Sequence, residues 1–451
     1  MHLGLDTNFA YILYAAGMVA FVASIFWRPI VGLFYLIPLL PLQTIRYRMD
    51  DLPLGSSVIG LMLVAVAVGV LRRRQPLLPK TPWTGLLIVY GGFTFVSLWM
   101  GSFYLRSDLP LPGEARFEVW QNYMVMPALL LLVAAVKPTK RQMLGLVLVM
   151  CLAGLALDRN FSDEVAGRDF SKFSVGLREG SGTMGYAGNN GLAAFEAQFA
   201  TFLLIMAAFE RRRLLKLGYY GVAGFSALCL MYSLSRGGYA AFLVGCLFLA
   251  VFKQRKLLVL MALFLLTWTT IVPTAVTERV SMTEQNDGGL DHSAETRLTI
   301  WQDAMEVFDA NILPGTGFNT YAYMHRVGNY EDTHNFFLKV LVEGGVVGLV
   351  LFLWLIVQTF RTGFRLFRRS KDPFFAALGL GLAGWVVAAV VANCFGDRWS
   401  FLQVCGYLWV IAGLVAQAWN LENAASAADG AGDTAAEAAA GIEEPETAVA
   451  V

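Results

Sequence analysis

Residues 332–348 read DTHNFFLKVLVEGGVVG and lead from a polar loop directly into an apolar run that ends near Phe360. His334 stands at the polar, water-facing end of the helix that this run predicts. Imidazole is the side chain best suited to proton transfer near neutral pH. His334 is therefore a candidate catalytic base, although an ordinary interfacial histidine would show the same pattern.

Apolar runs of this kind dominate the chain. Of its 451 residues, 57% are hydrophobic and 15% are charged, whereas about a quarter of the residues in soluble domains are charged. The runs are about 17–25 residues long, the length that crosses a bilayer, and we expect about 12–13 of them to do so. They predict an all-α fold, a polytopic integral membrane helical bundle. The predicted spans are 8–27, 29–46, 54–71, 83–100, 119–136, 142–158, 188–209, 218–234, 238–252, 257–275, 336–360, 374–393 and 400–418.

Two of these predictions carry an alternative. The first two spans together also fit a single hairpin, and 238–252 is short for a span.

Basic clusters predict how the bundle is oriented. Successive clusters are separated by pairs of spans, with a long loop added between the last two, so all five fit one face. The positive-inside rule makes that face cytoplasmic. The connections 101–118, 159–187 and 276–335, and the SRGG turn at 235–238, then lie on the opposite face, which in a bacterium is periplasmic or extracytoplasmic. The clusters are at 72–74, 137–141, 211–216, 253–256 and 361–371.

The chain divides into four parts. Residues 1–187 form N-terminal membrane spans, 188–360 form a core that includes the extracytoplasmic loop 276–335, and 361–420 form C-terminal spans. Residues 421–451 are rich in Ala, Glu, Asp and Gly, which predicts a disordered cytoplasmic tail. A weak alanine-driven helix is the alternative for this tail.

The loop 276–335 is long for an ordinary connection, and long ordered loops are usually functional. Within it, apolar residues recur at spacings of three and four, which predicts an amphipathic helix on the membrane domain or at its interface. These residues are Leu298, Trp301, Met305 and Phe308.

Chemical exclusions follow from the cysteines and histidines. The five cysteines show no C-x-x-C pairing, so neither a disulfide framework nor a thiolate metal site is expected. Only four histidines are present, and no H-E-x-x-H, Walker A or G-x-S-x-G motif occurs. We therefore expect no metal site and no cofactor, and we expect no nucleic-acid partner.

Two arginines are candidate phosphate ligands. Arg236 follows a long apolar span in SLSRGGYAAF, where an arginine is costly unless it meets a cavity, a counter-charge or the interface. A guanidinium fork binds phosphate oxygens bidentately, and Gly237 lets a ligand approach the backbone. A snorkelling interfacial arginine is the alternative for Arg236. Arg297 begins the predicted amphipathic helix, where it alternatively is a solvated residue or a partner of Glu295.

Two further polar residues are candidate substrate contacts. Asn190 lies near the outer end of a span, where an amide either holds sugar hydroxyls or caps the helix. Glu343 is an ionisable residue near membrane depth, which is a functional hypothesis by default. The neighbouring spacing of Gly344 and Gly348 favours close helix packing.

Further outer arginines stand close in sequence to acidic residues, and surface ion pairs are predicted for them. They are Arg46, Arg48 and Arg398, beside Asp50, Asp51 and Asp397.

Four short motifs follow one another along the predicted core. They are SRGG at 235–238, R-x-x-x-W at 297–301, PGTGFN at 314–319 and H-N-x-x-L-x-x-x-x-E-x-G at 334–345. In this order, and on one predicted face, they resemble the O-antigen ligase and polymerase superfamily. The resemblance covers residues 188–360.

The resemblance implies a substrate pair and a reaction. The donor would be an undecaprenyl-diphosphate-linked glycan within the membrane lipids, and the acceptor a hydroxyl of lipid A–core, of another glycan or of a protein. Transfer would be metal-independent and inverting. A polymerase that joins lipid-linked repeat units and a non-catalytic lipid-glycan transporter are the alternatives.

The resemblance also assigns roles to residues. Arg236 and Arg297 would engage the diphosphate, and His334 would activate the acceptor hydroxyl. The remaining substrate-binding positions would be Asn335, Gly237, Asn190 and Glu343.

Overall fold

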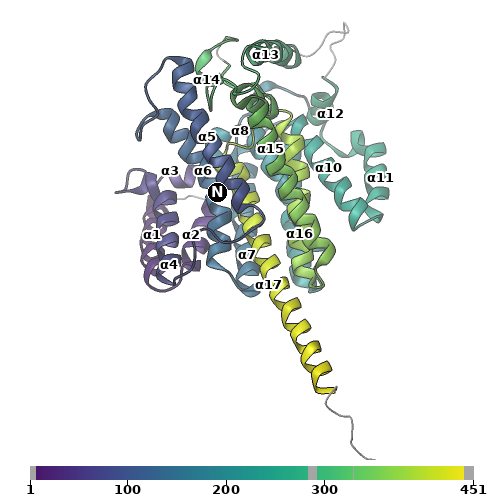
Figure 1. Ribbon diagram of the computed structural model, residues 1–451. Helices are drawn as coiled ribbons and strands as arrows, with labels where there is room; N and C mark the ends of the chain where they lie inside the picture. Colours follow the sequence, from purple (N-terminus) through teal and green to yellow (C-terminus); the bar gives the residue numbers. More distant parts are fainter. Residues whose placement is uncertain (1–6, 283–291, 329, 441–451) are drawn as a thin grey trace, which may run out of the picture.

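The computed structural model describes residues 7–282, 292–328 and 330–440; the side chains of 7–8, 292–294 and 425–440 are not described. Every regular element within these ranges is a helix (Figure 1). The chain is a polytopic helical membrane protein, as its apolar runs predict.

Among the described residues, ten helices are long and apolar enough to cross a membrane. They are α1 (Thr7–Phe26), α4 (Val58–Arg72, together with the preceding turn η1, Gly55–Ser57), α5 (Thr84–Leu105), α6 (Ala115–Val136), α7 (Lys140–Val165), α8 (Gly188–Phe209), α9 (Arg213–Tyr232), α15 (Phe336–Arg369), α16 (Pro373–Asn393) and α17 (Leu402–Ala440).

The three other predicted spans are helical, but two are short and one is bent. Helix α2 (Ile30–Leu39) ends just before Pro41, because proline lacks a backbone N–H and clashes with the preceding turn. Helix α10 (Arg236–Phe252) is short, as the sequence indicates. Helices α11 (Lys256–Ile271) and α12 (Thr274–Ser281) meet at Pro273 with a bend of 110° and count at most as an eleventh span.

The centre of the bundle is formed by α8, α16 and the first half of α17, whose apolar windows are the most enclosed. Aromatic rings from all three helices pack there: Phe199 of α8 lies 5.8 Å from Tyr407 and 6.3 Å from Trp385 between ring centroids. A helix that is apolar on all sides must be buried. By contrast, α11 buries no residue and stands at the edge of the bundle beside α10 (Figure 1).

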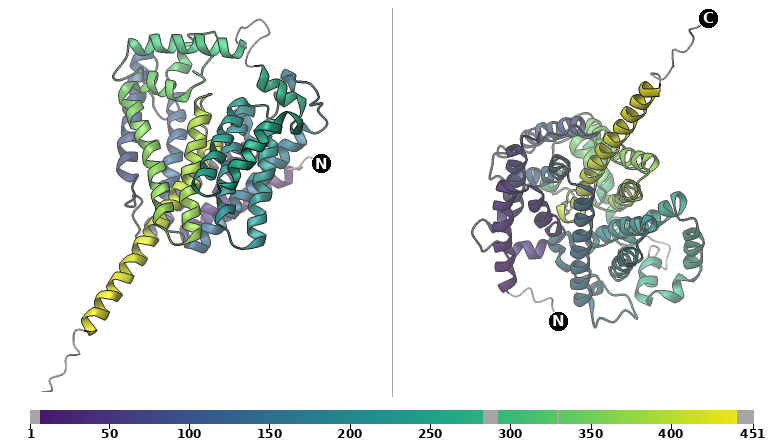
Figure 2. Two further views of the ribbon diagram at one scale, coloured as in Figure 1. Left: turned by 90° about the vertical axis from the view of Figure 1, so that its right-hand side faces the viewer. Right: turned by 90° about the horizontal axis from the view of Figure 1, so that it is seen from below.

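The long loop and the C-terminal tail lie at opposite ends of the bundle. Helices α12, α13 (His292–Asp309) and α14 (Tyr321–Met324) gather at one end, and α17 projects from the other (Figures 1 and 2). Residues of two basic clusters lie against aromatic rings at the α17 end, where Lys253 is 3.9 Å from the ring of Phe209 and Arg369 is 5.4 Å from that of Trp419. The predicted separation of loop and tail is therefore confirmed.

The tail differs from the predicted disorder over its first part. Residues 421–440 continue α17 as a helix, which is the alanine-driven alternative, since alanine has the highest helix propensity. The remaining predicted tail, 441–451, lies outside the described residues.

Helix α13 confirms the predicted amphipathic helix but not its buried stripe. Ile300, Ala304 and Val307 are buried, packing against Val342 of α15 and Tyr321 of α14. Among the predicted stripe residues, Trp301 and Phe308 pack at the edge of this cluster, whereas Leu298 and Met305 are exposed. The buried face is rotated because α15 and α14 cover the helix from one side.

Candidate active site

A cavity of about 270 Å³ opens at the end of the bundle that carries α12 and α13. Five arginines from five separate segments line it, and we call it the arginine cavity. They come from η2 (Val175–Arg178), the first residue of α10, α12, α13 and the connection between α16 and α17. The five are Arg178, Arg236, Arg279, Arg297 and Arg398.

The SRGG turn places Arg236 in this cavity. Leu234 adopts a left-handed backbone (φ +54°) that reverses the chain between α9 and α10. A Cβ at Gly238 would lie 2.8 Å from Ala193 Cβ, and one at Gly237 would lie 3.0 Å from Phe395 Cβ. Both glycines therefore allow the start of α10 to approach α8 and the end of α16 closely.

Asn190 contacts the same turn rather than capping α8. Its Oδ1 accepts a hydrogen bond from Ser235 Oγ at 2.9 Å and another from Arg178 Nη2 at 3.5 Å. The adjacent Asn189 donates from Nδ2 to the Ser233 carbonyl at 2.5 Å. The N-cap of α8 is Ala187, so the helix-cap interpretation does not hold. Asn190 instead links two arginine-bearing segments and lines the cavity.

Arg178 and Arg279 were not singled out from the sequence. Helix α12 is attached to the preceding connection by a hydrogen bond from Ala275 N to Phe170 O at 3.1 Å and by one from Phe173 N to Glu278 Oε2 at 2.7 Å. The guanidinium of Arg279 lies 5.2 Å from the Phe173 ring. These tertiary contacts bring the two connections together, and residue spacing in the sequence does not reveal them.

Arg398 does not form the surface ion pair with Asp397 that the sequence predicts. Asp397 is buried and accepts a hydrogen bond from Lys339 Nζ at 3.0 Å, because α15 brings the lysine beside it. Arg398 donates from Nη1 to the main-chain oxygen of Asp397 at 3.1 Å, and its side chain lines the cavity. Burial lowers the pKa of Arg398 from its usual value.

His334 lies in the connection that leads from α14 into α15. The Thr333 carbonyl accepts a hydrogen bond from Trp301 Nε1 at 2.9 Å. Asn335 is the N-cap of α15, and its Oδ1 accepts from Phe337 N and Leu338 N. Between them, His334 has a left-handed backbone (φ +53°), an uncommon conformation for a residue other than glycine. The hydrogen bonds of the two neighbouring residues therefore fix the backbone on both sides of His334.

The imidazole of His334 lies within electrostatic reach of two arginines that line the arginine cavity, Arg297 and Arg398. Its Nδ1 lies 3.6 Å from Asp332 Oδ2, and its side chain is 32% exposed. Burial lowers the pKa of His334, the charge of Asp332 raises it, and the charges of Arg297 and Arg398 lower it again. The net direction is downward, which favours the neutral form of the ring. A neutral ring can accept a proton.

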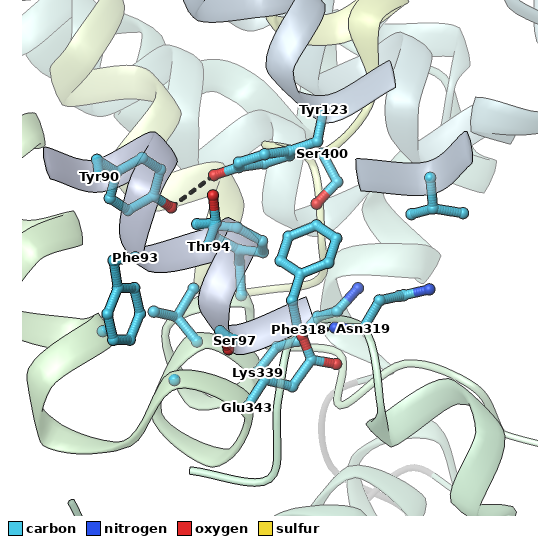
Figure 3. A pocket seen from close by; sticks show the side chains of 15 residues that line it. Tyr90, Phe93, Thr94, Ser97, Tyr123, Phe318, Asn319, Lys339, Glu343 and Ser400 are labelled. Atoms are coloured by element: carbon cyan, nitrogen blue, oxygen red, sulfur yellow. Dashed lines mark hydrogen bonds between the residues drawn. The ribbon is translucent and has the colours of Figure 1, made fainter. Parts of the chain in front are cut away.

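Glu343 lies apart from this site. Its Oε2 accepts from Asn319 N at 2.9 Å and its Oε1 from Tyr321 N at 3.2 Å. Both oxygens thus hold the PGTGFN turn against α15. Glu343 borders a second, small cavity of about 70 Å³, together with Lys339 and the Tyr90–Tyr123 pair (Figure 3).

The PGTGFN turn fits tightly between α5 and α15. A Cβ at Gly315 would lie 2.4 Å from the Glu343 carbonyl oxygen, and one at Gly317 would lie 2.2 Å from Gly101 Cα. Arg116 donates to the Phe318 carbonyl at 3.1 Å from the side of α6. This turn therefore requires its glycines, which let it pack directly on the backbones of α5 and α15.

The structure brings the predicted residues into three groups. Four of them line the arginine cavity: Arg236, Gly237, Asn190 and Arg297. His334 and its neighbour Asn335 form the turn beside it. Glu343 stands at the second cavity. In the described part of the chain, no group of three or more His, Cys, Asp or Glu side chains is arranged to hold a metal ion.

Comparison with protein-family models gives a match within the predicted core. Residues 221–353 match the family model described as O-antigen ligase. This segment holds the SRGG turn, Arg279, Arg297 and His334, whereas Arg178 and Arg398 lie outside it. The match confirms the predicted resemblance to the O-antigen ligase and polymerase superfamily, and it indicates a function of ligase or polymerase type. No curated protein matches the chain.

Proposed function

We propose that this protein is an O-antigen ligase-like glycosyltransferase of the bacterial inner membrane. It moves a glycan from an undecaprenyl diphosphate carrier to a hydroxyl of its acceptor on the periplasmic face. The observation that carries the proposal is the convergence of five arginines on one cavity, with His334 close enough for the charges of Arg297 and Arg398 to act on its imidazole. The family match over residues 221–353 supports it.

The arginine cavity suits a diphosphate leaving group. As the bond between the anomeric carbon and the phosphate oxygen breaks, negative charge grows on the departing lipid diphosphate. Guanidinium groups bind phosphate oxygens bidentately, and preorganised donors of this kind each stabilise a transition state by about 2–4 kcal/mol. Arg236 and Arg297 face that charge from α10 and α13. Arg178, Arg279 and Arg398 line the same cavity and add to its positive charge.

His334 is suited to take the proton of the acceptor hydroxyl. Asp332 beside Nδ1 favours the tautomer with its proton on that nitrogen, which leaves the Nε2 lone pair available. The acceptor oxygen forms its bond to the anomeric carbon on the side opposite the diphosphate, so the configuration inverts. The atoms balance: the hydroxyl proton passes to His334, and the glycan exchanges one oxygen partner for another.

The placement of the arginines favours transfer over transport. A transporter of the same lipid would need to neutralise the diphosphate along a path through the bundle. The arginines that line the cavity instead come from the segments around α12 and α13, at one end of the molecule.

Glycan profiles of a deletion strain test the proposed reaction. We expect loss of all long glycan on lipid A–core, with polymer retained on its lipid carrier. A plasmid with the wild-type gene should restore the profile, and one encoding His334→Ala should not. Accumulation of lipid A–core bearing a single repeat unit would instead assign the protein as a polymerase.

A further inference from the structure

A second basic site lies at the opposite end of the bundle, where α17 projects. It is a pocket of about 580 Å³, which we call the tail-side pocket. Its basic residues are Lys140, Arg141, Arg211 and Arg212. Its apolar floor includes Leu144, Met206, Phe209 and Phe374. We propose that this pocket binds the phosphate headgroup of an anionic phospholipid from the adjacent leaflet, a function separate from glycan transfer.

Three helices begin at this pocket. Residues of the first turns of α7 and α16, and the residues directly before α9, line it. Helix N-termini carry partial positive charge and N–H groups without intrahelical partners, which favours anions. The first turns of α7 and α16 are capped by Thr139 and Asp372. The N-cap of α9, Arg212, makes no side-chain cap.

The ion pairs in the pocket neutralise only part of its positive charge. Lys140 pairs with Asp372, and Arg212 pairs with Glu210 at 3.0 Å. The guanidinium groups of Arg141 and Arg211 form no ion pair or hydrogen bond with any residue that the structure describes. Two basic side chains therefore remain to contact a phosphate.

The apolar surroundings favour a lipid over a soluble phosphate. The floor of the pocket is hydrophobic, and Leu214 and Leu217 at the start of α9 are 87% and 65% exposed. Leucines exposed to this extent beside a basic site are stabilised where acyl chains cover them. Basic pockets between membrane helices on the cytoplasmic side bind anionic headgroups. A phospholipid offers both the phosphate and the chains.

Lipid binding by the purified full-length protein tests this proposal. The test variant combines Arg141→Gln with Arg211→Gln. The matched control combines Arg365→Gln with Arg368→Gln, which removes the same charge from exposed positions of α15 outside the pocket. Titration with phosphatidylglycerol, followed by native mass spectrometry, should show affinity about 30-fold weaker in the test variant, and unchanged in the control.

Three outcomes decide the matter. Wild-type affinity in the test variant, or an equal loss in the control, would overturn the site. Thermal unfolding of the wild type is also measured with inorganic phosphate and with phosphatidylglycerol. Equal protection by the two would overturn the lipid assignment. If the double variant does not stay folded in phosphatidylcholine, the single variants Arg141→Gln and Arg211→Gln are used instead. Each should bind phosphatidylglycerol about fivefold more weakly than the wild type.

Discussion

The arginine cavity and the tail-side pocket are both rich in basic residues, yet they differ in how the chain builds them. The tail-side pocket draws on the clusters 137–141 and 211–216, in which basic residues adjoin one another. The arginine cavity draws single arginines from segments far apart in the sequence. Clustered basic residues mark orientation in a membrane protein. A single arginine near membrane depth is energetically costly unless it meets a cavity or a counter-charge. The convergence of several such arginines therefore indicates a binding site.

The largest expected effect on transfer belongs to His334, which lies near the arginine cavity; the lining of the tail-side pocket includes no histidine. A positioned general base contributes about 10²–10⁴-fold in rate, so His334→Ala should lower kcat by that factor with donor binding retained. His334→Gln should fail similarly, since an amide can hydrogen-bond but is a negligible base. His325→Gln, at an exposed histidine, is the control and should be active. A glutamine variant with a third or more of the wild-type rate would remove general-base catalysis.

Arg236 tests whether the cavity binds phosphate through the guanidinium fork. Arg236→Ala should lower kcat/KM by about 10²–10³-fold, the effect of losing one preorganised donor. Arg236→Lys should fail nearly as badly, because an ammonium cannot form two parallel bonds. The matched control is Arg326→Lys, on an exposed arginine that pairs with Asp303. Near-wild-type activity of Arg236→Lys would contradict bidentate binding.

The pH profile of transfer should move in opposite directions in two variants. His334 must be neutral to act, so the rate falls as pH drops through its pKa, which lies below the usual 6.5. Arg398 lowers that pKa, so Arg398→Gln should move the acidic limb to higher pH. Asp332 raises it, so Asp332→Asn should move the limb to lower pH. The measurement is kcat against pH at saturating donor, and shifts of equal sign would contradict the proximity of these charges to His334.

The tail-side pocket should give the smallest effect on transfer. The Arg141→Gln and Arg211→Gln pair lies at the other end of the bundle, and distant sites act independently. Its kcat/KM in detergent should stay within about twofold of wild type. A loss as large as that of Arg236→Ala would mean that the two basic regions do not have separate tasks.

The sequence predicted helices well because apolar runs are local. Each predicted span corresponds to a helical segment, and the shortened ones end where Pro41 or the bend at Pro273 interrupts them. The buried face of α13 was misplaced because it depends on α14 and α15, which cover it. Residue spacing alone cannot show which face a neighbour will cover.

The site was predicted only in part. Arg236, Arg297 and His334 belong to motifs, so the sequence singled them out. Arg178 and Arg398 carry no motif, and only folding brings them to the same cavity. Glu343 was recognised as an ionisable residue at depth, but its partners are backbone N–H groups more than 20 residues earlier in the chain.

Transfer by the purified protein tests most directly whether the arginine cavity catalyses glycan transfer. Wild-type protein of verified fold is mixed in detergent with an undecaprenyl-diphosphate-linked glycan and lipid A–core, with no membrane and no gradient. We predict formation of glycosylated lipid A–core with release of undecaprenyl diphosphate, in equal amounts. Absence of transfer with these matched substrates, together with movement of the lipid-linked glycan across reconstituted vesicles, would contradict catalysis and assign the cavity to a transporter.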